Sequence, residues 1–337
     1  MAGIKDVARL AGVSVGTVSN VLNRPASVSP LLRERVGRAI DELGFVRNES
    51  ARHLRAGVSQ TIAAVVLDVA NPFFTDVVSG AEQAADAEDT LVVVCNSGGD
   101  PEREGRHLAR LEGQPVRGVL LTPVLDELNP LAQRLRDRGT PVVLLDRVSP
   151  QADLPSVAVD DRRGGQLVGD HLLERGHRDV VLVGAPLGMR QVRERLEGLR
   201  AAGEGALRVQ AVESRGMSVR AGAEAAAGVL DAQRGRPAGE RATALVCAND
   251  LLALGALNEC LRRGVRVPED LALVGYDDID FVATAPVPLT SVRQPRQQLG
   301  RAAVELLLEH VGPGSPAHGG RQVVYQPDLV VRASTGG

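Results

Sequence analysis

The apolar positions at the start of the chain recur at the spacing of one face of a helix. They form two short stripes, the first made of Val7, Ala8 and Ala11 and the second of Val18 and Val21. Between the stripes, Gly12 suits the left-handed backbone that ends a helix, and Ser14 suits an N-cap. The pattern predicts a helix-turn-helix, whose second helix fits the major groove of DNA, and an ordinary helical hairpin is the alternative. The free face of that second helix holds Val15, Gly16, Thr17 and Asn20.

A third helix is predicted over residues 30–43. Pro30 suits the first helical position after Ser29, and Gly44 stands just past the end. The apolar face of this helix consists of Leu32, Val36, Ile40 and Leu43. Because Phe45 can close the small core that these side chains begin, we expect residues 1–47 to form a compact headpiece of three helices.

Residues 48–57 predict a short helix between the headpiece and the rest of the chain. Asn48 suits its start and Gly57 its end, but about two turns are marginal as an isolated helix in water. We therefore expect this segment to fold only when another surface holds it. Leu54, next to Arg55 and near Arg52, has no evident core to join. It suits either insertion into a DNA minor groove or a plain linker, and both interpretations stay open.

From residue 61 onward, short apolar runs alternate with amphipathic helical patterns. The runs are Ile62–Leu67, Leu91–Cys95, Gly118–Leu121, Val142–Leu145, Val180–Val183, Val209–Val212, Leu245–Cys247 and Leu271–Val274. Continuous runs of this length are typical of parallel strands whose two faces are covered by helices. Because the runs fall into two series, the sequence predicts two doubly wound lobes rather than one.

The alternating pattern breaks at residues 157–161 and 289–295, which we expect to be the crossings between the lobes. Polar side chains follow several of the runs, among them Asp68, Asn71, Asn96, Asp146, Arg147, Asn249 and Asp277. Ligands of such folds bind outside the carboxyl ends of the strands. Carboxylates and amides at that place suit the directed hydrogen bonds of a polyhydroxylated ligand.

Positive charge is concentrated at the start of the chain. The first 60 residues hold nine Lys or Arg and five Asp or Glu, a net charge of +4, whereas the whole chain carries −3, which leaves −7 for the rest. A basic headpiece on an acidic body directs one end of the molecule toward phosphates. The charge difference supports the helix-turn-helix prediction without establishing it.

The sequence lacks the usual signatures of enzymes, metal sites and membrane segments. The three cysteines have neither CxxC spacing nor histidine partners, which is typical of a reducing compartment. No apolar stretch suits a signal peptide or a membrane span. The phosphate-binding and nucleophile-elbow patterns are absent as well. We therefore expect no catalytic residues, no metal, no cofactor and no membrane partner.

Several short motifs occur in a characteristic order along nearly the whole chain. In the headpiece they are Asp6-Val7-Ala8, Ala11-Gly12-Val13-Ser14, Thr17-Val18-Ser19 and Val21-Leu22-Asn23. In the body they are Asn71-Pro72-Phe73-Phe74, Val159-Asp160, Gly176-His177-Arg178, Arg195-Leu196-Glu197-Gly198, Ala248-Asn249-Asp250 and Val274-Gly275-Tyr276-Asp277-Asp278. In this order they resemble the LacI/GalR family of bacterial transcriptional regulators. The resemblance implies an α/β protein: a helix-turn-helix headpiece and hinge helix, then a two-lobed, periplasmic-binding-protein-like core of doubly wound parallel sheets.

For the headpiece, the resemblance implies a set of DNA contacts. The family's base-reading positions are occupied by Val15, Gly16 and Asn20. Val15 offers apolar contact to a thymine methyl, and Asn20 suits adenine. Further DNA-contacting positions are Ser14, Thr17, Ser19, Asn23 and Ser29. In the hinge, Leu54 matches the leucine that the family inserts at the centre of a near-palindromic operator, and the neighbouring contacts are Asn48, Ala51 and Arg52.

For the body, the resemblance implies an effector pocket between the lobes. Its members here are Phe73, Asp146, Arg147, Arg195, Asn249, Asp277 and Phe281. Arg195 is expected to bridge ligand hydroxyls, and Asp277 to accept hydrogen bonds from others. Arg147 in the pocket favours an acidic or phosphorylated ligand, and a cross-lobe ion pair is its alternative role.

The chain departs from several relatives near Met217, where those relatives have an aromatic ring that stacks on the ligand. With no tryptophan and four phenylalanines in the chain, Phe73 or Phe281 is expected to supply the apolar platform. The alternative is a ligand with no face to stack.

The resemblance divides the chain into three parts. They are the headpiece at 1–47, the hinge helix and linker at 48–60 and the effector-binding core at 61–337. Within the core, the first lobe is expected at 61–159 and 291–320, and the second at 160–290 and 321–333.

The predicted function is a cytoplasmic, sugar-responsive transcriptional repressor without enzymatic activity, which binds near-palindromic double-stranded DNA as a homodimer. Two alternatives belong to other classes. A sugar-binding protein with no DNA role is disfavoured by the basic headpiece. A sugar-modifying α/β enzyme is disfavoured because no catalytic constellation is evident in the sequence.

Overall fold

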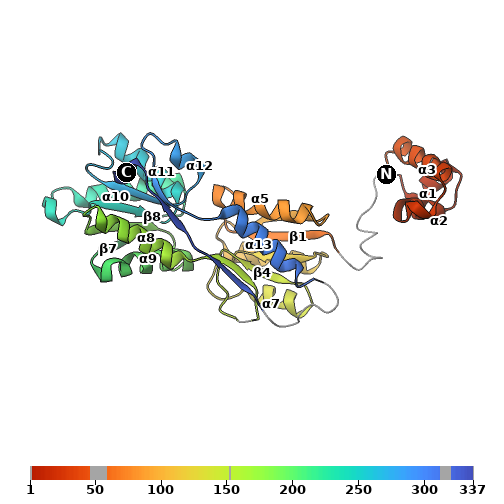
Figure 1. The fold of residues 1–337 in the computed structure, drawn as a ribbon, viewed down its shortest axis with the longest axis horizontal. Helices are drawn as coiled ribbons and strands as arrows, with labels where there is room; N and C mark the ends of the chain where they lie inside the picture. Colours follow the sequence, from red (N-terminus) through yellow and green to blue (C-terminus); the bar gives the residue numbers. More distant parts are fainter. Residues whose placement is uncertain (1, 46–58, 152, 312–319, 337) are drawn as a thin grey trace. The chain divides into compact units, whose positions relative to one another are not determined.

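The computed structural model describes residues 2–45, 59–151, 153–311 and 320–336 (Figure 1). The chain consists of two units, Met1–Val58 and Ser59–Gly337. The expected hinge contacts Asn48, Ala51, Arg52 and Leu54 lie outside the described residues.

The described headpiece is helical. Its elements are α1 (Ile4–Ala11), α2 (Val15–Asn23), the 3-10 turn η1 (Pro25–Ser27) and α3 (Pro30–Leu43). The side chains of Val7, Val18 and Val36 are fully buried in the cluster that joins the three helices. The predicted helix-turn-helix and the predicted third helix are therefore confirmed.

The turn between α1 and α2 is held by local caps and by α3. Gly12 has φ 63° and ends α1 in the left-handed conformation that glycine tolerates. Ser14 Oγ accepts a hydrogen bond from the backbone N–H of Thr17 at 3.0 Å, which starts α2. Arg35 of α3 donates from Nη2 to the carbonyl oxygen of Ala11 at 2.6 Å. The third helix thus satisfies a carbonyl group that the end of α1 leaves without a helical partner.

The body contains two sheets with the same connectivity. In spatial order the first consists of β11 (Gln322–Tyr325), β5 (Ser156–Val159), β4 (Val142–Leu145), β3 (Gly118–Leu121), β1 (Thr61–Val66) and β2 (Leu91–Asn96). The second consists of β12 (Asp328–Val330), β10 (Thr290–Arg293), β9 (Ala272–Asp277), β8 (Ala244–Cys247), β6 (Asp179–Gly184) and β7 (Arg208–Glu213). Pairing is parallel except between β10 and β12. Both sheets are doubly wound, as the sequence predicts.

The structure corrects two details of the predicted organisation. The segments at 157–161 and 289–295 contain strands β5 and β10, not crossings alone. β10 belongs to the second sheet and β11 to the first, so the expected assignment of 291–293 and of 322–325 to the opposite lobes is wrong. The reason is that β11 pairs with β5 far back in the sequence, and no local pattern specifies such a partner. The chain therefore passes between the lobes three times, after β5, after β10 and after β11.

Helices cover both faces of the first sheet. They are α5 (Pro72–Asp86), α6 (Pro101–Glu112), α7 (Pro130–Asp137) and α13 (Arg296–Leu308). Alternate residues of β1 show the two faces, because Ile62 and Ala64 pack in the cluster of α5 and α13, whereas Ala63 and Val65 pack in that of α6 and α7. Figure 1 shows α5 and α13 side by side along the sheet, and their residues are in extensive contact.

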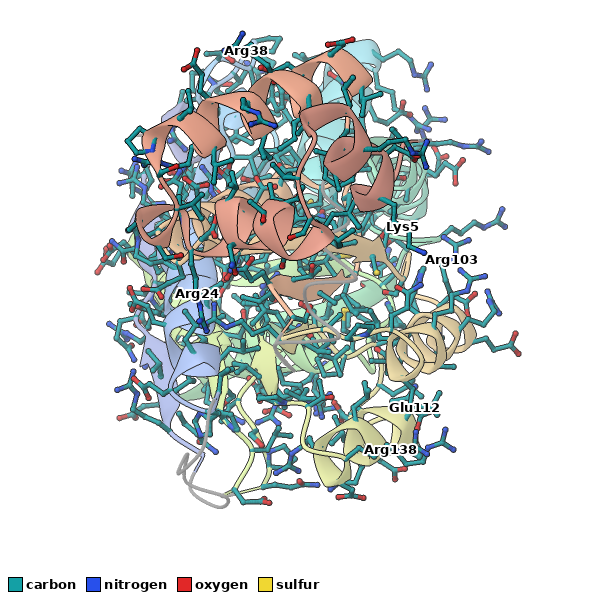
Figure 2. The ribbon with its side chains drawn as sticks, turned by 90° about the vertical axis from the view of Figure 1, so that its right-hand side faces the viewer. Lys5, Arg24, Arg38, Arg103, Glu112 and Arg138 are labelled. Atoms are coloured by element: carbon teal, nitrogen blue, oxygen red, sulfur yellow. The ribbon has the colours of Figure 1, made fainter. Side chains whose placement is uncertain are left out.

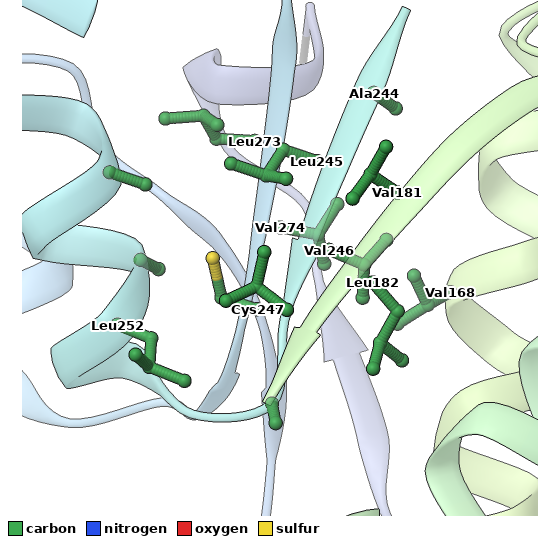
Figure 3. Packing of buried hydrophobic residues seen from close by; sticks show 14 of the residues in the cluster. Val168, Val181, Leu182, Ala244, Leu245, Val246, Cys247, Leu252, Leu273 and Val274 are labelled. Atoms are coloured by element: carbon green, nitrogen blue, oxygen red, sulfur yellow. The ribbon is translucent and has the colours of Figure 1, made fainter. Parts of the chain in front are cut away.

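The second lobe repeats this layering. Its helices are α8 (Asp161–Glu174), α9 (Arg190–Ala201), α10 (Val219–Gln233), α11 (Asp250–Arg262) and the short α12 (Asp280–Ala283), with 3-10 turns η2 (Ala202–Gly205), η3 (Ala238–Glu240) and η4 (Ala333–Thr335). Figure 3 shows its core, where the paired rows are Val181–Leu245–Leu273 and Leu182–Val246–Val274. The two rows alternate along the strands and therefore face opposite sides of the sheet.

In the second lobe, α8 packs closely on α9 at the point where the chain arrives from β5. A Cβ atom on Gly198 of α9 would lie 1.9 Å from the carbonyl oxygen of Arg162 on α8, so only glycine permits this approach. The contact brings Asp161, the first residue of α8, beside Arg195 of α9.

The edge strand β2 departs from the expectation that every apolar run is covered. Leu91 is 63% exposed, Val93 42% and Val94 38%. In the described chain β2 pairs with β1 alone, so its outer side has no further strand to cover it. None of the described helices is long and apolar enough to cross a membrane.

Candidate functional site

The headpiece presents the exposed face of α2 opposite its core. The sequence-predicted contacts at or in α2 are Ser14, Val15, Gly16, Thr17, Ser19, Asn20 and Asn23, and Ser29 is the N-cap residue of α3. Val15 is 42% exposed, and Asn20 is exposed as well, whereas Val18 between them is fully buried. The side of α2 that carries the predicted base-reading positions is therefore free of the headpiece core.

Basic side chains extend from each part of the headpiece. Figure 2 labels Lys5 on α1, Arg24 directly after α2 and Arg38 on α3, and all three are exposed. Arg38 also lies 3.0 Å from Glu34, an exposed pair that contributes little stability. This exposed positive charge is what a module that contacts DNA phosphates requires.

A cavity of about 290 Å³ lies between the two lobes of the body. It is formed by the loops that follow the carboxyl ends of β1, β2, β4, β6, β7, β8 and β9. Its lining consists of Leu67, Asp68, Asn71, Phe73, Phe74, Gly98, Gly99, Asp146, Ala185, Pro186, Met189, Gln191, Val192, Arg195, Gly216, Met217, Asn249 and Asp277. Five of the seven sequence-predicted effector residues are in this lining: Phe73, Asp146, Arg195, Asn249 and Asp277.

The structure removes Arg147 from the cavity. Its guanidinium is buried and donates to the carbonyl oxygens of Leu125 and Asp126 in the loop after β3. Because these two carbonyl groups satisfy donors of the guanidinium, the side chain of Arg147 points away from the cavity. The cross-lobe ion pair in this region is instead made by Arg193 of α9, whose Nη2 lies 2.8 Å from Asp126 Oδ2.

Phe281 is also outside the cavity lining. It is 61% exposed on α12, because that short helix buries its neighbour Val282 instead. The apolar side of the cavity is supplied by Phe73, whose ring lies 5.0 Å from that of Phe74 in an edge-to-face arrangement, and by Met217.

Arg195 is held rigidly at the cavity wall. Its Nε donates to Asp161 Oδ1 at 2.7 Å, and its Nη1 donates to the carbonyl oxygen of Ala248 at 2.6 Å. The guanidinium also lies over the ring of Tyr276, 3.6 Å from the ring centre. Arg195 is 7% exposed and Asp161 is 4% exposed, so this is a buried ion pair.

Two carboxyl groups of the cavity, one from each lobe, contact the opposite lobe. Asp146 of the first lobe has φ 57°, and Asp277 of the second has φ 107°, both unusual for residues other than glycine. Asn71 Nδ2 donates to Asp277 Oδ2 at 3.3 Å, and Gln191 Nε2 donates to Asp146 Oδ2 at 3.2 Å. Because each of these hydrogen bonds joins the two lobes, the cavity residues also hold the lobes together.

Burial shifts the acidity of both carboxyl groups. Desolvation raises the pKa of Asp146 to about 8, the nearby Asp161 charge adds to the rise, and Arg195 opposes it. Desolvation raises the pKa of Asp277 to about 6, against the influence of Arg195 and of the hydrogen bonds from Asn71 and Gln294. Both groups therefore titrate near neutral pH.

The Asp146→Asn variant is expected to raise the free energy of unfolding, and by more at pH 8 than at pH 5. Between its ordinary pKa of 3.8 and its raised pKa of about 8, Asp146 holds a proton in the folded chain that the unfolded chain has lost. Folded stability therefore falls as pH rises through this window, and a neutral amide removes that loss. Urea unfolding of both proteins at the two pH values measures the difference.

Asp280→Asn is the matched control, because Asp280 is exposed on α12 and its substitution should produce no such pH dependence. A gain for Asp146→Asn that is equal at both pH values, or larger at pH 5, argues against a buried protonated carboxyl group.

Sequence reasoning missed several residues of the cavity wall. Met189 lines it from the segment between β6 and α9, and Gln191 lines it from the first turn of α9. Both follow the carboxyl end of a predicted strand. That position is the signal that could have identified them.

Comparison with known proteins shows similarity along the whole chain. Residues 3–48 match the model described as bacterial regulatory proteins, lacI family, and residues 169–335 match a periplasmic binding protein-like domain. The chain is 32% identical over 336 residues to the HTH-type transcriptional repressor PurR of Vibrio atlanticus (strain LGP32), which covers 99% of this chain and 98% of that protein.

Two solved structures extend the similarity to three dimensions. The lac repressor dimer bound to operator and the anti-inducer ONPF is 28% identical, with a TM-score of 0.82 and 99% of both chains covered. The complex of the transcriptional regulator CelR with cellobiose is 32% identical, with a TM-score of 0.71 and coverage of 99% of this chain and 100% of that one.

Proposed function

The chain belongs to the LacI family of bacterial regulatory proteins, and the relatives named above are transcriptional repressors rather than enzymes. We propose that a sugar-like effector controls how tightly this chain binds a near-palindromic operator. The observation that supports this best is the cavity between the lobes, whose residues also make the hydrogen bonds that join the lobes. A ligand that competes for those bonds favours one arrangement of the lobes over another.

The sugar-like class is supported by the chemistry of the lining. Asp146 and Asp277 offer carboxylate oxygens to hydroxyl donors, and Phe73 and Met217 offer an apolar side against which a sugar ring can rest. The similar regulator CelR is described in complex with cellobiose, which is also a carbohydrate. A flat purine base is the competing class, because the ring of Phe73 is suited to stacking.

The proposed readers of DNA are the exposed residues of α2. Val15 suits a thymine methyl group and Asn20 suits adenine, while Gly16 lets the backbone approach the groove. Further DNA contacts are proposed for Ser14, Thr17, Ser19, Asn23 and Ser29, which lie at the starts of helices or along α2. The roles of Asn48, Ala51, Arg52 and Leu54 stay predictions.

A homodimer is proposed because a near-palindromic operator presents two equivalent half-sites. The exposed apolar side chains of the edge strand, Leu91, Val93 and Val94, are suited to a contact with a second copy. The similar lac repressor structure is described as a dimer on its operator. Because the operator is part of the bacterial DNA, the proposed place of action is the cytoplasm.

Asn20→Ala is expected to weaken binding to the selected operator by about 1–3 kcal/mol while leaving binding to unrelated DNA unchanged. The amide is proposed to make paired hydrogen bonds to one base, which alanine cannot make. Fluorescence anisotropy on the operator and on a scrambled duplex, at the same salt concentration, measures both affinities.

The control is Leu31→Ala, which removes a side chain that is 66% exposed on α3 and should change neither affinity. An equal loss of affinity on both duplexes for Asn20→Ala removes Asn20 from the base-reading residues.

A further inference from the structure

The balance of donors and acceptors in the cavity is one-sided. Each donor-bearing side chain of the lining already donates within the protein. The donations are Asn71 to Asp277, Gln191 to Asp146, Asn249 to the carbonyl oxygen of Met217, and Arg195 to Asp161 and to the carbonyl oxygen of Ala248. A ligand that donates hydrogen bonds therefore suits this cavity better than one that only accepts them.

Among the described lining residues, one buried carboxyl oxygen has no hydrogen-bond partner. Asp146 is 5% exposed, and its Oδ2 accepts from Gln191, but its Oδ1 has no hydrogen-bond partner. A buried carboxyl oxygen without a hydrogen-bond partner is energetically unfavourable. A ligand atom that donates to Oδ1 supplies the missing hydrogen bond and thereby favours binding.

Acidic side chains outnumber basic ones around the cavity. Arg195 is the one basic side chain among the described lining residues, and Asp161 behind it compensates its charge at 2.7 Å. This leaves the carboxyl groups of Asp68, Asp146 and Asp277 in the lining without a matching cation. With Arg147 turned away, nothing in the described lining favours an acidic or phosphorylated ligand.

We propose that the effector is a polyhydroxylated amine of the amino sugar class and that its ammonium group binds Oδ1 of Asp146. An ammonium group carries three donors and no acceptor, which matches a site rich in acceptors. Its hydrogen bonds to a carboxylate are about twice as strong as those of a neutral hydroxyl group. The inference rests on the proposed sugar-like effector and adds that this effector carries a positive charge, which distinguishes it from a neutral sugar.

Proton release is an independent consequence of this arrangement. The charged groups that act on Asp146 are Asp161 of α8, Arg195 of α9 and Asp277 of β9, and burial keeps its carboxyl group protonated at neutral pH in the free chain. A ligand cation favours the ionised carboxylate, so binding expels a proton. Calorimetry in two buffers with different ionisation enthalpies measures that proton.

The test is titration calorimetry of the full chain at neutral pH with glucosamine, galactosamine and mannosamine, each beside its neutral hexose and its N-acetyl derivative. At least one amine is expected to bind about tenfold or more tightly than both neutral counterparts, with proton release. Asp146→Asn should abolish the preference, so that the amine and the hexose bind alike. Asp280→Asn, an exposed substitution on α12, should retain it.

The outcomes separate this inference from the proposed function. Neutral hexoses that bind as tightly as their amines overturn the inference and leave the sugar-like effector standing. Purine bases that bind while every sugar fails overturn both. An amine preference that survives in Asp146→Asn, with the variant folded by circular dichroism, also overturns the inference, as does the failure of all three amines to bind at millimolar concentration.

Discussion

Asp277→Asn is expected to abolish the response of operator binding to the effector while leaving operator affinity without effector within about 0.5 kcal/mol of the parent value. Asp277 lines the cavity and accepts hydrogen bonds from Asn71 of the first lobe at 3.3 Å and from Gln294 at 2.8 Å. An amide in this place has the same shape and tolerates the positive φ, but half of its polar atoms become donors that face donors.

The measurement is anisotropy of a labelled operator with and without a ligand that raises the Tm of the parent chain. The parent should respond by about 5-fold to 150-fold, the usual range of coupling between two sites, and the variant should not respond. Asp280→Asn should respond like the parent. A normal response in Asp277→Asn excludes Asp277 from the coupling between cavity and headpiece.

Arg195→Met is expected to lower the free energy of unfolding by about 3–5 kcal/mol. Methionine keeps much of the length and the apolar contact with Tyr276, but it leaves the buried carboxylate of Asp161 without its 2.7 Å partner. The loss therefore comes mainly from an uncompensated buried charge and not from a cavity.

The double variant Arg195→Met with Asp161→Asn separates these causes. Because the second substitution removes the uncompensated charge, the double variant should recover about 1 kcal/mol or more relative to the single variant in urea unfolding. A double variant that is less stable than Arg195→Met alone shows that the loss is one of packing and contradicts the assignment of Arg195 and Asp161 as a charge pair.

Local patterns sufficed for the headpiece and for most strands. The spacing of Val7, Val18 and Val36 and the turn chemistry of Gly12 and Ser14 are local properties, and the structure confirms the helices that they predict. The eight apolar runs became strands as well. Six of them are buried parallel strands that are recognisable from their own composition, whereas the edge strands β2 and β7 are partly exposed.

Features that depend on distant partners could not be predicted. The lobe to which β11 belongs is decided by its pairing with β5, more than 150 residues earlier in the sequence. Arg147 was expected to face the cavity because it follows a strand, yet its direction is decided by two carbonyl groups of another loop. Phe281 was expected there because an aromatic ring suited the cavity, but α12 buries Val282 instead.

The contacts that join the lobes also explain why occupancy of the cavity can matter for the whole chain. The chain passes between the lobes three times, and Asn71, Gln191 and Arg193 add direct hydrogen bonds or an ion pair between them. A ligand that replaces some of these contacts changes the relative stability of the lobe arrangements, and either direction of response, induction or corepression, follows from the same physics.

The central claim is that the exposed face of α2 reads DNA and that the cavity between the lobes controls how tightly it does so. Its most direct test is selection of duplexes from a random library by the full chain, followed by titration of the selected duplex with and without a ligand that raises the Tm. The account predicts a near-palindromic sequence and a change in affinity of about fivefold or more on ligand binding. Recovery of no common sequence, or an affinity that a saturating ligand leaves unchanged, would contradict it.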